Sequence, residues 1–123
     1  MIIGVGTDIL KISRIENAFN KHGDRFSKRV LCPTELDIFK NKNKSISFLA
    51  KRFSAKEAAS KALGTGIGLI SWQDFEVKND SFGAPTIELT GGAKKRMKEM
   101  GASQALISLS DESDHVLSFV VLF

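Results

Sequence analysis

The spacing of hydrophobic residues predicts helices in the first half of the chain and mainly strands in the second half. An opening strand is the exception, because β-branched residues alternate over residues 1–10. Asp8 is predicted to lie on the other side of this strand from Ile3, Val5, Thr7 and Ile9. Helical spacing follows over residues 11–20, and this segment ends at His22 and Gly23. Residues 25–29 are predicted to extend the helical region beyond that stop.

A second, short helix is predicted after Cys32, with Thr34 as its N-cap, and a long central helix then runs into a glycine turn at residues 64–68. Alternation returns in residues 72–78 and 85–90, which predicts a β-hairpin. The remaining predicted elements are a helix over 90–101 with Met97 and Met100 on its core face, and strands over 105–110 and 116–123. The last strand is apolar enough to be buried on both faces.

These elements predict one α+β domain, residues 1–123, in which a mainly antiparallel sheet packs against a long central helix and shorter helices. A single cysteine excludes an internal disulfide, and no window is long and apolar enough for a membrane span or a secretory signal. We therefore expect a protein of the reducing cytoplasm that has no membrane partner.

One face of the central helix carries the apolar residues Ile46, Leu49, Ala50 and Phe53. Glu57, Ser60 and Lys61 continue the same stripe. Charged groups are rarely buried unless they are paired or liganded, so this stripe is a candidate functional site. Two structural alternatives remain open here: Ser54 and Glu57 have the spacing of a capping box, and Glu57 and Lys61 that of an exposed i,i+4 pair.

Asp8 and the glycine turn also have ordinary structural explanations. Asp8 could cap the helix that follows the first strand, and Gly64 to Gly68 could simply end the central helix. The negative end of a helix does not attract phosphate, so anion binding at this turn would need Lys61, Arg52 or the turn amides.

The formal net charge of +4 is unevenly distributed along the chain. Residues 11–61 contain 13 Lys or Arg against 5 Asp or Glu, which favours an acidic partner for this half. Nucleic acid is disfavoured, because the chain has no Tyr, only one Trp and no known reader motif. An acidic protein or a phosphate ligand fits better.

Two separated motifs carry a family resemblance: Gly4-Val-Gly-Thr-Asp-Ile-Leu-Lys-Ile-Ser-Arg-Ile15 and Arg52-Phe-Ser-Ala-Lys-Glu-Ala-Ala-Ser-Lys-Ala-Leu-Gly-Thr-Gly-Ile67. With them the chain resembles the bacterial holo-[acyl-carrier-protein] synthases, the small trimeric class of 4′-phosphopantetheinyl transferases. The resemblance implies transfer of the phosphopantetheine arm of coenzyme A to a serine of apo-acyl carrier protein, with release of adenosine 3′,5′-bisphosphate. It also implies a homotrimer with sites between protomers.

The resemblance assigns roles to individual residues. Asp8 and Glu57 match the family's Mg²⁺ ligands, with Mn²⁺ as a possible substitute, and Glu57 and Lys61 match its catalytic base and its diphosphate-binding cation. The residues expected to line the cofactor are Ser60, Gly64, Thr65 and Gly66, with Arg52, Lys42 and Lys44 as weaker candidates for the nucleotide phosphates. The basic residues expected to bind the carrier protein are Arg14, Lys21, Arg25, Lys28 and Arg29.

One position departs from the family pattern, since Asp111 stands where relatives commonly carry a histidine near the cofactor. A carboxylate there is expected to repel a phosphate. His115 is not its positional match, and we expect it to be a half-exposed residue at the start of a strand. Two other functions stay open: a basic binding module without catalysis, and an enzyme that uses the same metal pair to hydrolyse a diphosphate.

Overall fold

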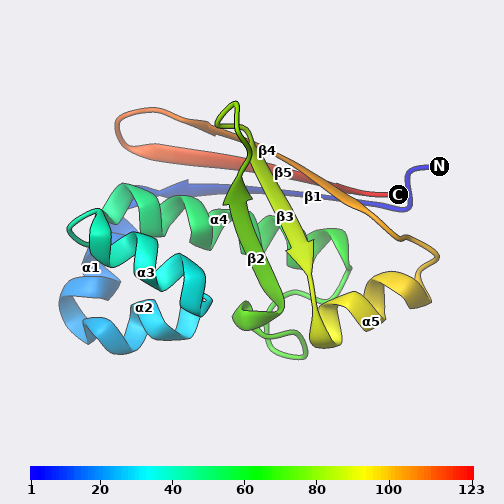
Figure 1. Cartoon of the computed structure of the whole chain (residues 1–123), viewed down its shortest axis with the longest axis horizontal. Helices are drawn as coiled ribbons and strands as arrows, with labels where there is room; N and C mark the ends of the chain where they lie inside the picture. Colours follow the sequence, from blue (N-terminus) through cyan, green and yellow to red (C-terminus); the bar gives the residue numbers. More distant parts are fainter.

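In the computed structural model, which describes residues 1–123, one long helix packs against a three-stranded sheet (Figure 1). The elements in order are β1 (Gly4–Lys11), α1 (Ile12–His22), α2 (Asp24–Val30), α3 (Pro33–Asn41), α4 (Ile46–Ala62), a 3-10 turn η1 (Trp72–Asp74), β2 (Phe75–Asn79), β3 (Pro85–Leu89), α5 (Gly91–Glu99), β4 (Ala105–Asp111) and β5 (His115–Leu122). The predicted α+β class is therefore confirmed. Helices α1, α2 and α3 lie together at one end of the molecule and α5 lies at the other.

The sheet joins the first strand of the chain to the last two, in the order β1-β5-β4, and all pairs are antiparallel. Its register places Asp8 of β1 directly opposite Ser118 of β5. The predicted hairpin forms a separate two-stranded sheet, β2-β3, that runs across α4 (Figure 1). The edge strand β1, which carries Asp8, is thus held by its hydrogen bonds to the central strand β5.

Helix α4 begins at Ile46, because the Ser45 hydroxyl accepts a hydrogen bond of 3.3 Å from the Phe48 amide. Ser54 lies inside the helix, so the alternative in which Ser54 caps it is wrong. Small residues fill much of its second half, and Ala55, Ala58 and Ala59 are fully buried. None of the helices in the structure is long and apolar enough to cross a membrane.

Two glycines let β1 lie directly on the backbone of α4. A Cβ atom at Gly6 would stand 2.0 Å from the Ala58 carbonyl oxygen, and one at Gly4 would stand 2.4 Å from that of Ala62. Any side chain at these positions would push the strand away from the helix. The glycines of the first motif therefore bring Asp8 within reach of the second half of α4.

We expect Gly6→Ala to destabilise the protein by about 1–3 kcal/mol, since the added methyl group meets backbone atoms that have no room to move. Gly92→Ala is the matched control, because its nearest new contact, an Asp74 side-chain oxygen at 3.4 Å, is tolerable and α5 gains a better helix former. Chemical denaturation compares the two variants. Equal stability of Gly6→Ala and wild type would contradict the close packing.

The structure differs from the predicted elements at two helix starts. Residues 25–29 do not extend α1, because Gly23 turns the chain with φ 60° and ψ −140° and a separate helix begins. The N-cap of α3 is Cys32, with Pro33 in the first turn, so the prediction of Thr34 as N-cap was wrong. The Thr34 hydroxyl instead donates to Glu76 on β2.

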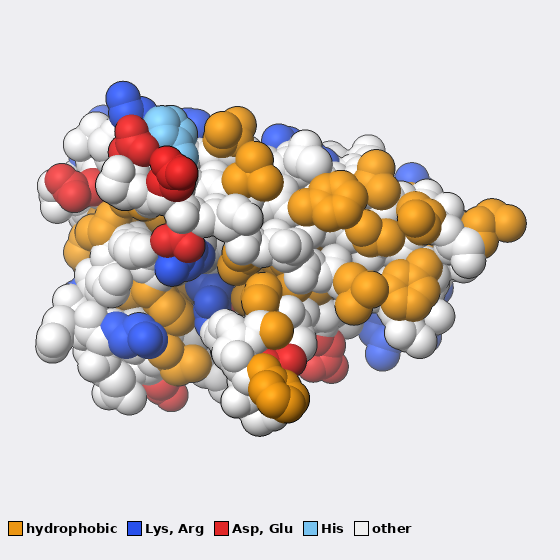
Figure 2. Space-filling view, turned by 90° about the horizontal axis from the view of Figure 1, so that it is seen from above, with side chains coloured by type: hydrophobic (Ala, Val, Ile, Leu, Met, Phe, Trp, Pro, Cys, Tyr) orange, Lys and Arg blue, Asp and Glu red, His pale blue; other side chains and the backbone are white.

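The outer face of the sheet is apolar and uncovered, so the prediction that the last strand is buried on both faces was wrong for the single chain. Val116, Val120 and Leu122 of β5 point inward and are fully buried. The exposed hydrophobic residues on the sheet strands are Val5, Ile9, Leu106, Leu117 and Phe119, which we call the apolar sheet face. Figure 2 looks onto this side of the molecule and shows hydrophobic side chains spread along it.

Candidate active site

Asp8 of β1 and Glu57 of α4 form a carboxylate pair at the contact between strand and helix. The Asp8 side chain is 13% exposed, and Glu57 is half-buried. Burial raises the pKa of Glu57 above its ordinary value, and the negative charge of Asp8 raises it further, while Lys61 and Arg14 act in the opposite direction. A carboxylate placed beside a second negative charge in this way is suited to bind a cation or a proton.

Lys61 contacts the Asp8 side of this pair. Its Nζ atom lies 3.2 Å from Asp8 Oδ1 and donates to the Thr7 carbonyl oxygen at 3.0 Å. Lys61 is half-exposed rather than buried, and the alternative of a Glu57 and Lys61 ion pair is not formed. Asp8 does not cap α1 either, because the N-cap is Lys11 and no side chain bonds to the first amides.

The raised pKa of Glu57 makes the stability of the metal-free protein depend on pH. Ionised Glu57 destabilises the folded state at neutral pH, and this penalty disappears as the pH falls below the ordinary carboxyl value of 4.5. We therefore expect Glu57→Gln to raise the thermal unfolding midpoint in EDTA at about pH 7, with the gain lost toward about pH 4. Thermal unfolding across this range tests it, and a gain independent of pH would contradict the assigned cause.

The glycine turn follows directly from the helix that carries Glu57 and Lys61. The amides of Thr65 and Gly66 donate to the Ser60 carbonyl oxygen at 3.3 and 3.2 Å, and Gly64 and Gly66 have φ values of 73° and 67°. The Ser60 hydroxyl is buried and donates to the Glu57 carbonyl oxygen at 2.7 Å. The turn is thus a helix C-cap, and its exposed backbone at Gly64 lies about two helical turns beyond Glu57.

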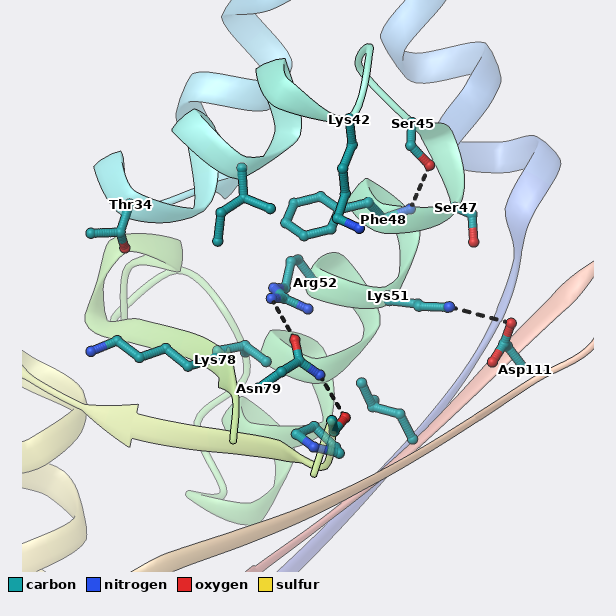
Figure 3. Close-up of a pocket in the computed structure, with 15 residues that line it drawn as sticks. Thr34, Lys42, Ser45, Ser47, Phe48, Lys51, Arg52, Lys78, Asn79 and Asp111 are labelled. Carbon is teal, nitrogen blue, oxygen red and sulfur yellow. Dashed lines mark hydrogen bonds and ion pairs between the residues drawn. The ribbon is translucent and has the colours of Figure 1, made fainter. Parts of the chain in front are cut away.

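Arg52 points away from the carboxylate pair, to the opposite side of α4, since five residues separate it from Glu57 and this corresponds to about 140° around a helix. There it lines an open cavity of about 730 Å³ between α3, α4 and the β2-β3 hairpin (Figure 3). The guanidinium lies 4.4 Å from the centre of the Phe48 ring, and one of its nitrogens donates to Asn79 at 3.3 Å. The predicted cofactor residues therefore form two groups in one chain.

The same cavity contains three further cations, Lys42, Lys51 and Lys78. Its carboxylate is Asp111, whose Oδ2 atom lies 3.4 Å from Lys51 Nζ (Figure 3). Asp111 is thus paired with a cation rather than isolated, which reduces the repulsion that we expected from it. Lys44 is not part of the lining and instead forms an ion pair of 3.0 Å with Asp24.

The predicted carrier-binding residues are all on the surface of α1 and α2. The exposed basic side chains are Arg14, Lys21, Arg25, Lys28 and Arg29. His115 is half-exposed as predicted, and its ring lies 3.1 Å from the Asp114 carboxylate. Arg14 is the member of the basic set that is close enough to act on the charge of Glu57.

A buried ion pair that was not predicted from the sequence lies behind the cavity. The Nζ atom of Lys56 lies 2.6 Å from the Glu35 carboxylate and also donates to the carbonyl oxygens of Val30 and Trp72, and both charged side chains are almost completely buried. The other Glu35 oxygen accepts from the Val77 amide and lies 3.7 Å from Arg52 Nε. The pair therefore connects four segments of chain and orients Arg52.

Periodicity held a signal for this pair, because Lys56 lies seven residues after Leu49 and seven before Leu63, which are both fully buried. The neighbouring Cys32 is buried in the same cluster, and its Sγ atom lies 3.1 Å from the Phe75 carbonyl oxygen. Burial raises the pKa of the Cys32 thiol to about 11. This cysteine is therefore a packing residue and not a nucleophile at neutral pH.

The chain matches known proteins over nearly its whole length. A sequence model of the 4′-phosphopantetheinyl transferase superfamily matches residues 4–120. A holo-[acyl-carrier-protein] synthase of Halorhodospira halophila is 47% identical, and the match covers 99% of this chain and 98% of the relative.

Solved structures agree with this match. The holo-[acyl-carrier-protein] synthase of Neisseria meningitidis is 44% identical with a TM-score of 0.91, over 100% of this chain and 99% of that one. The Helicobacter pylori enzyme, solved in complex with coenzyme A, is 32% identical with a TM-score of 0.83, over 97% and 99% of the two chains. With both of its motifs meeting at one site, the chain belongs to the 4′-phosphopantetheinyl transferase superfamily and, within it, to the holo-[acyl-carrier-protein] synthases.

Proposed function

We propose that this protein transfers the 4′-phosphopantetheine arm of coenzyme A to a serine hydroxyl of an apo-acyl carrier protein, with adenosine 3′,5′-bisphosphate as the second product. The observation that carries the proposal is the meeting of Asp8, Glu57 and Lys61 at one contact between β1 and α4. The names of the relatives supply the carrier protein, and the coenzyme A complex of the Helicobacter pylori relative supports the donor.

The carboxylate pair fits a magnesium ion. Mg²⁺ takes one or two carboxylates and completes its octahedron with waters and substrate phosphates, whereas zinc sites need three or four protein ligands. No group of three or more His, Cys, Asp or Glu side chains in the structure is arranged to hold a metal ion, so a pair of carboxylates suits Mg²⁺ better than zinc. Asp8 and Glu57 would hold the ion, which would neutralise charge on the diphosphate under attack.

In this mechanism Glu57 receives the proton of the attacking serine. In the metal-free protein burial and the charge of Asp8 raise its pKa, and a proton acceptor works best when its pKa approaches the operating pH. The serine oxygen forms a bond to the pantetheine-side phosphorus while the bond from that phosphorus to the bridging oxygen of the diphosphate breaks. The electron pair of that bond leaves with adenosine 3′,5′-bisphosphate.

Lys61 would stabilise the leaving group. Its ammonium is half-exposed beside Asp8, so it can reach a phosphate oxygen without leaving the site. The glycine turn beyond it presents backbone without side chains at Gly64 and Gly66, which allows a ligand to approach closely. Ser60, in contrast, is buried and already hydrogen-bonded, so its contribution is to hold the turn and not to contact the cofactor.

The basic surface of α1 and α2 would bind the carrier protein. Its five cations are exposed, and Arg14 connects this surface to the carboxylate pair through its effect on Glu57. A carrier protein with an acidic recognition surface would therefore be steered toward the site where its serine must react.

We also propose that the complete site forms between copies of the chain in a homotrimer. The carboxylate pair and the cationic cavity face opposite sides of α4, so a single chain cannot direct both at one nucleotide. The apolar sheet face is the kind of exposed hydrophobic surface that marks an interface. Contact between copies would cover this face and bring one protomer's cavity to its neighbour's carboxylates.

Phe119→Asp is expected to convert the trimer into monomers, because it places a charge in the middle of the apolar sheet face. Light scattering during size-exclusion chromatography measures the change. Asn20→Asp, an exposed position on α1, introduces the same charge outside this face and should leave the assembly intact. A wild-type protein that is monomeric at all concentrations would contradict the trimer.

The reaction is tested by the intact mass of an apo-acyl carrier protein after incubation with this protein, coenzyme A and Mg²⁺. We expect a gain of one phosphopantetheine group, no gain in EDTA, and recovery when Mg²⁺ is added in excess. Coenzyme A consumed without any gain in mass would indicate hydrolysis instead. A folded protein that modifies none of several carrier proteins would indicate a binding module.

A further inference from the structure

Two buried hydroxyl groups lie behind the Asp8 carboxylate and connect it to the core of the sheet. Ser54 of α4 and Ser118 of β5 are both fully buried. Ser54 Oγ donates to Asp8 Oδ2 at 2.8 Å, and Ser118 Oγ lies 2.7 Å from Ser54 Oγ. Three elements that are distant in sequence therefore meet in one short chain of hydrogen bonds.

The direction of these bonds follows from the chemistry of the groups. An ionised carboxylate only accepts hydrogen bonds, so the single proton of Ser54 points at Asp8. With that proton engaged, Ser54 can only accept from Ser118, and Ser118 is the donor. A serine inside a helix commonly donates to the carbonyl oxygen four residues earlier. Ser118 favours the orientation in which Ser54 donates to Asp8 instead. Its own hydroxyl donates to the Ser54 oxygen, and this aligns the Ser54 proton with Asp8.

The chain of hydrogen bonds makes the two oxygens of Asp8 different. Oδ2 faces inward and is held by Ser54, whereas Oδ1 faces outward, 3.2 Å from the half-exposed ammonium of Lys61. The sheet register is consistent with this geometry, since Ser118 is the direct partner of Asp8 in the pairing of β1 with β5. The carboxylate is thus held on its buried edge by a fully buried hydroxyl, while its outer edge contacts only the half-exposed ammonium of Lys61.

We propose that Ser54 and Ser118 are positioning residues that orient the Asp8 carboxylate so that Oδ1 is presented to a divalent cation. This inference rests on the proposed function, in which Asp8 holds the metal. Partners that orient a metal-binding carboxylate typically change metal affinity by about 10- to 100-fold. Consecutive hydroxyl groups also polarise one another, which strengthens the bond from Ser54 to Asp8.

The test is the binding of Mn²⁺, followed by electron paramagnetic resonance with saturating coenzyme A and no carrier protein. Ser54→Ala is expected to weaken Mn²⁺ binding about tenfold. Ser118→Ala should weaken it less, by about threefold, because Ser54 can still donate but is no longer aligned. In turnover assays the Mg²⁺ concentration for half-maximal rate should rise for both variants, with kcat at saturating Mg²⁺ within about threefold of wild type.

Two comparisons separate positioning from a structural role. Ser27→Ala removes another fully buried hydroxyl, which donates to the Asp24 carbonyl oxygen in α2, and it should leave Mn²⁺ affinity unchanged. Ser118→Ala should add nothing in a Ser54→Ala background, because Ser118 acts through Ser54. Additive losses in the double variant would contradict the chain of hydrogen bonds.

Wild-type Mn²⁺ affinity in Ser54→Ala, even with lower thermal stability, would overturn the inference and leave the proposed function untouched. If Ser54→Ala does not fold, Ser118→Ala decides, and unchanged affinity in that variant overturns the inference as well. Failure of the proposed metal site is distinguishable, because wild-type protein itself would then bind no Mn²⁺, and the inference would fall with it.

Discussion

Asp8→Asn and Glu57→Gln are each expected to lower kcat/KM for carrier-protein modification by about 10³-fold, while the protein remains folded. Each variant keeps the size of the side chain and removes one of the two charges that would hold the proposed metal. A loss of about 4 kcal/mol of transition-state stabilisation corresponds to about this factor. In the Asp8→Asn variant the new amide oxygen can still accept the hydrogen bond from Ser54, so the effect reports charge and not packing.

Steady-state rates with coenzyme A and apo-carrier protein measure this loss, and Glu99→Gln serves as the control because it neutralises an exposed carboxylate on α5. Binding of the carrier protein should be retained in both site variants, since the basic surface of α1 and α2 is unchanged. Turnover at the wild-type rate after either substitution would remove the carboxylate pair from the chemistry and favour the binding-module function.

The second large effect is on stability. Lys56→Met is expected to destabilise the protein by about 3–5 kcal/mol, because it removes the cation at 2.6 Å from the buried Glu35 carboxylate and leaves only Arg52, at 3.7 Å, beside it. Methionine replaces the length and the apolar volume of the lysine, so the loss arises from the charge and from the carbonyl oxygens of Val30 and Trp72 that lose their donor.

Adding Glu35→Gln to Lys56→Met should recover part of this stability, since neither partner is then charged. Chemical denaturation at one protein concentration measures all the variants, because association contributes to the apparent stability of an oligomer. Lys44→Met removes a cation from the exposed pair with Asp24 and should change stability by less than about 1 kcal/mol. A small effect of Lys56→Met would contradict the buried pair as the link between the four segments.

The sequence was sufficient to predict the carboxylate pair. It did not indicate that the predicted cofactor-binding residues lie on two opposite sides of α4. Asp8 lies in an alternating strand and Glu57 continues an apolar stripe, so the period marked both as candidates, but it left structural alternatives open and the family resemblance assigned their roles. The structure brings the two carboxylates together. Arg52 belongs to the same motif as Glu57. It nevertheless faces the cavity, because five residues along a helix place Arg52 and Glu57 on different faces. The motif alone does not show which of its residues act together on one ligand.

Other differences arise because α4 is buried on nearly all sides. A helix between a sheet and other helices has no single apolar stripe, so the stripe through Glu57 and Lys61 did not indicate that Lys61 is half-exposed. The burial of Lys56 left only a weak trace in the sequence, its seven-residue spacing from Leu49 and Leu63. The last strand shows the opposite case. Its apolar pattern predicts burial on both faces, and the inner face is buried within the chain, whereas the outer face is exposed in the single chain and would be covered only in the proposed trimer.

The central claim is that one chain's carboxylate pair acts with the cavity of another, and mixed assemblies test it most directly. Glu57→Gln impairs one half of each site and Arg52→Gln the other, so each variant alone should have little activity. After unfolding and refolding together at equal amounts, each half of a site is intact with a probability of about one half, and about a quarter of the sites should be complete.

Glu57→Gln mixed with Asp8→Asn is the matched control, because both substitutions damage the same half and no complete site can form. Native mass spectrometry of differently tagged chains establishes that mixed assemblies are present. Recovery to about a quarter of wild-type activity, in the first mixture only, is the predicted result. Activity no greater than the mean of the two parents, in assemblies shown to be mixed, would contradict a site shared between copies.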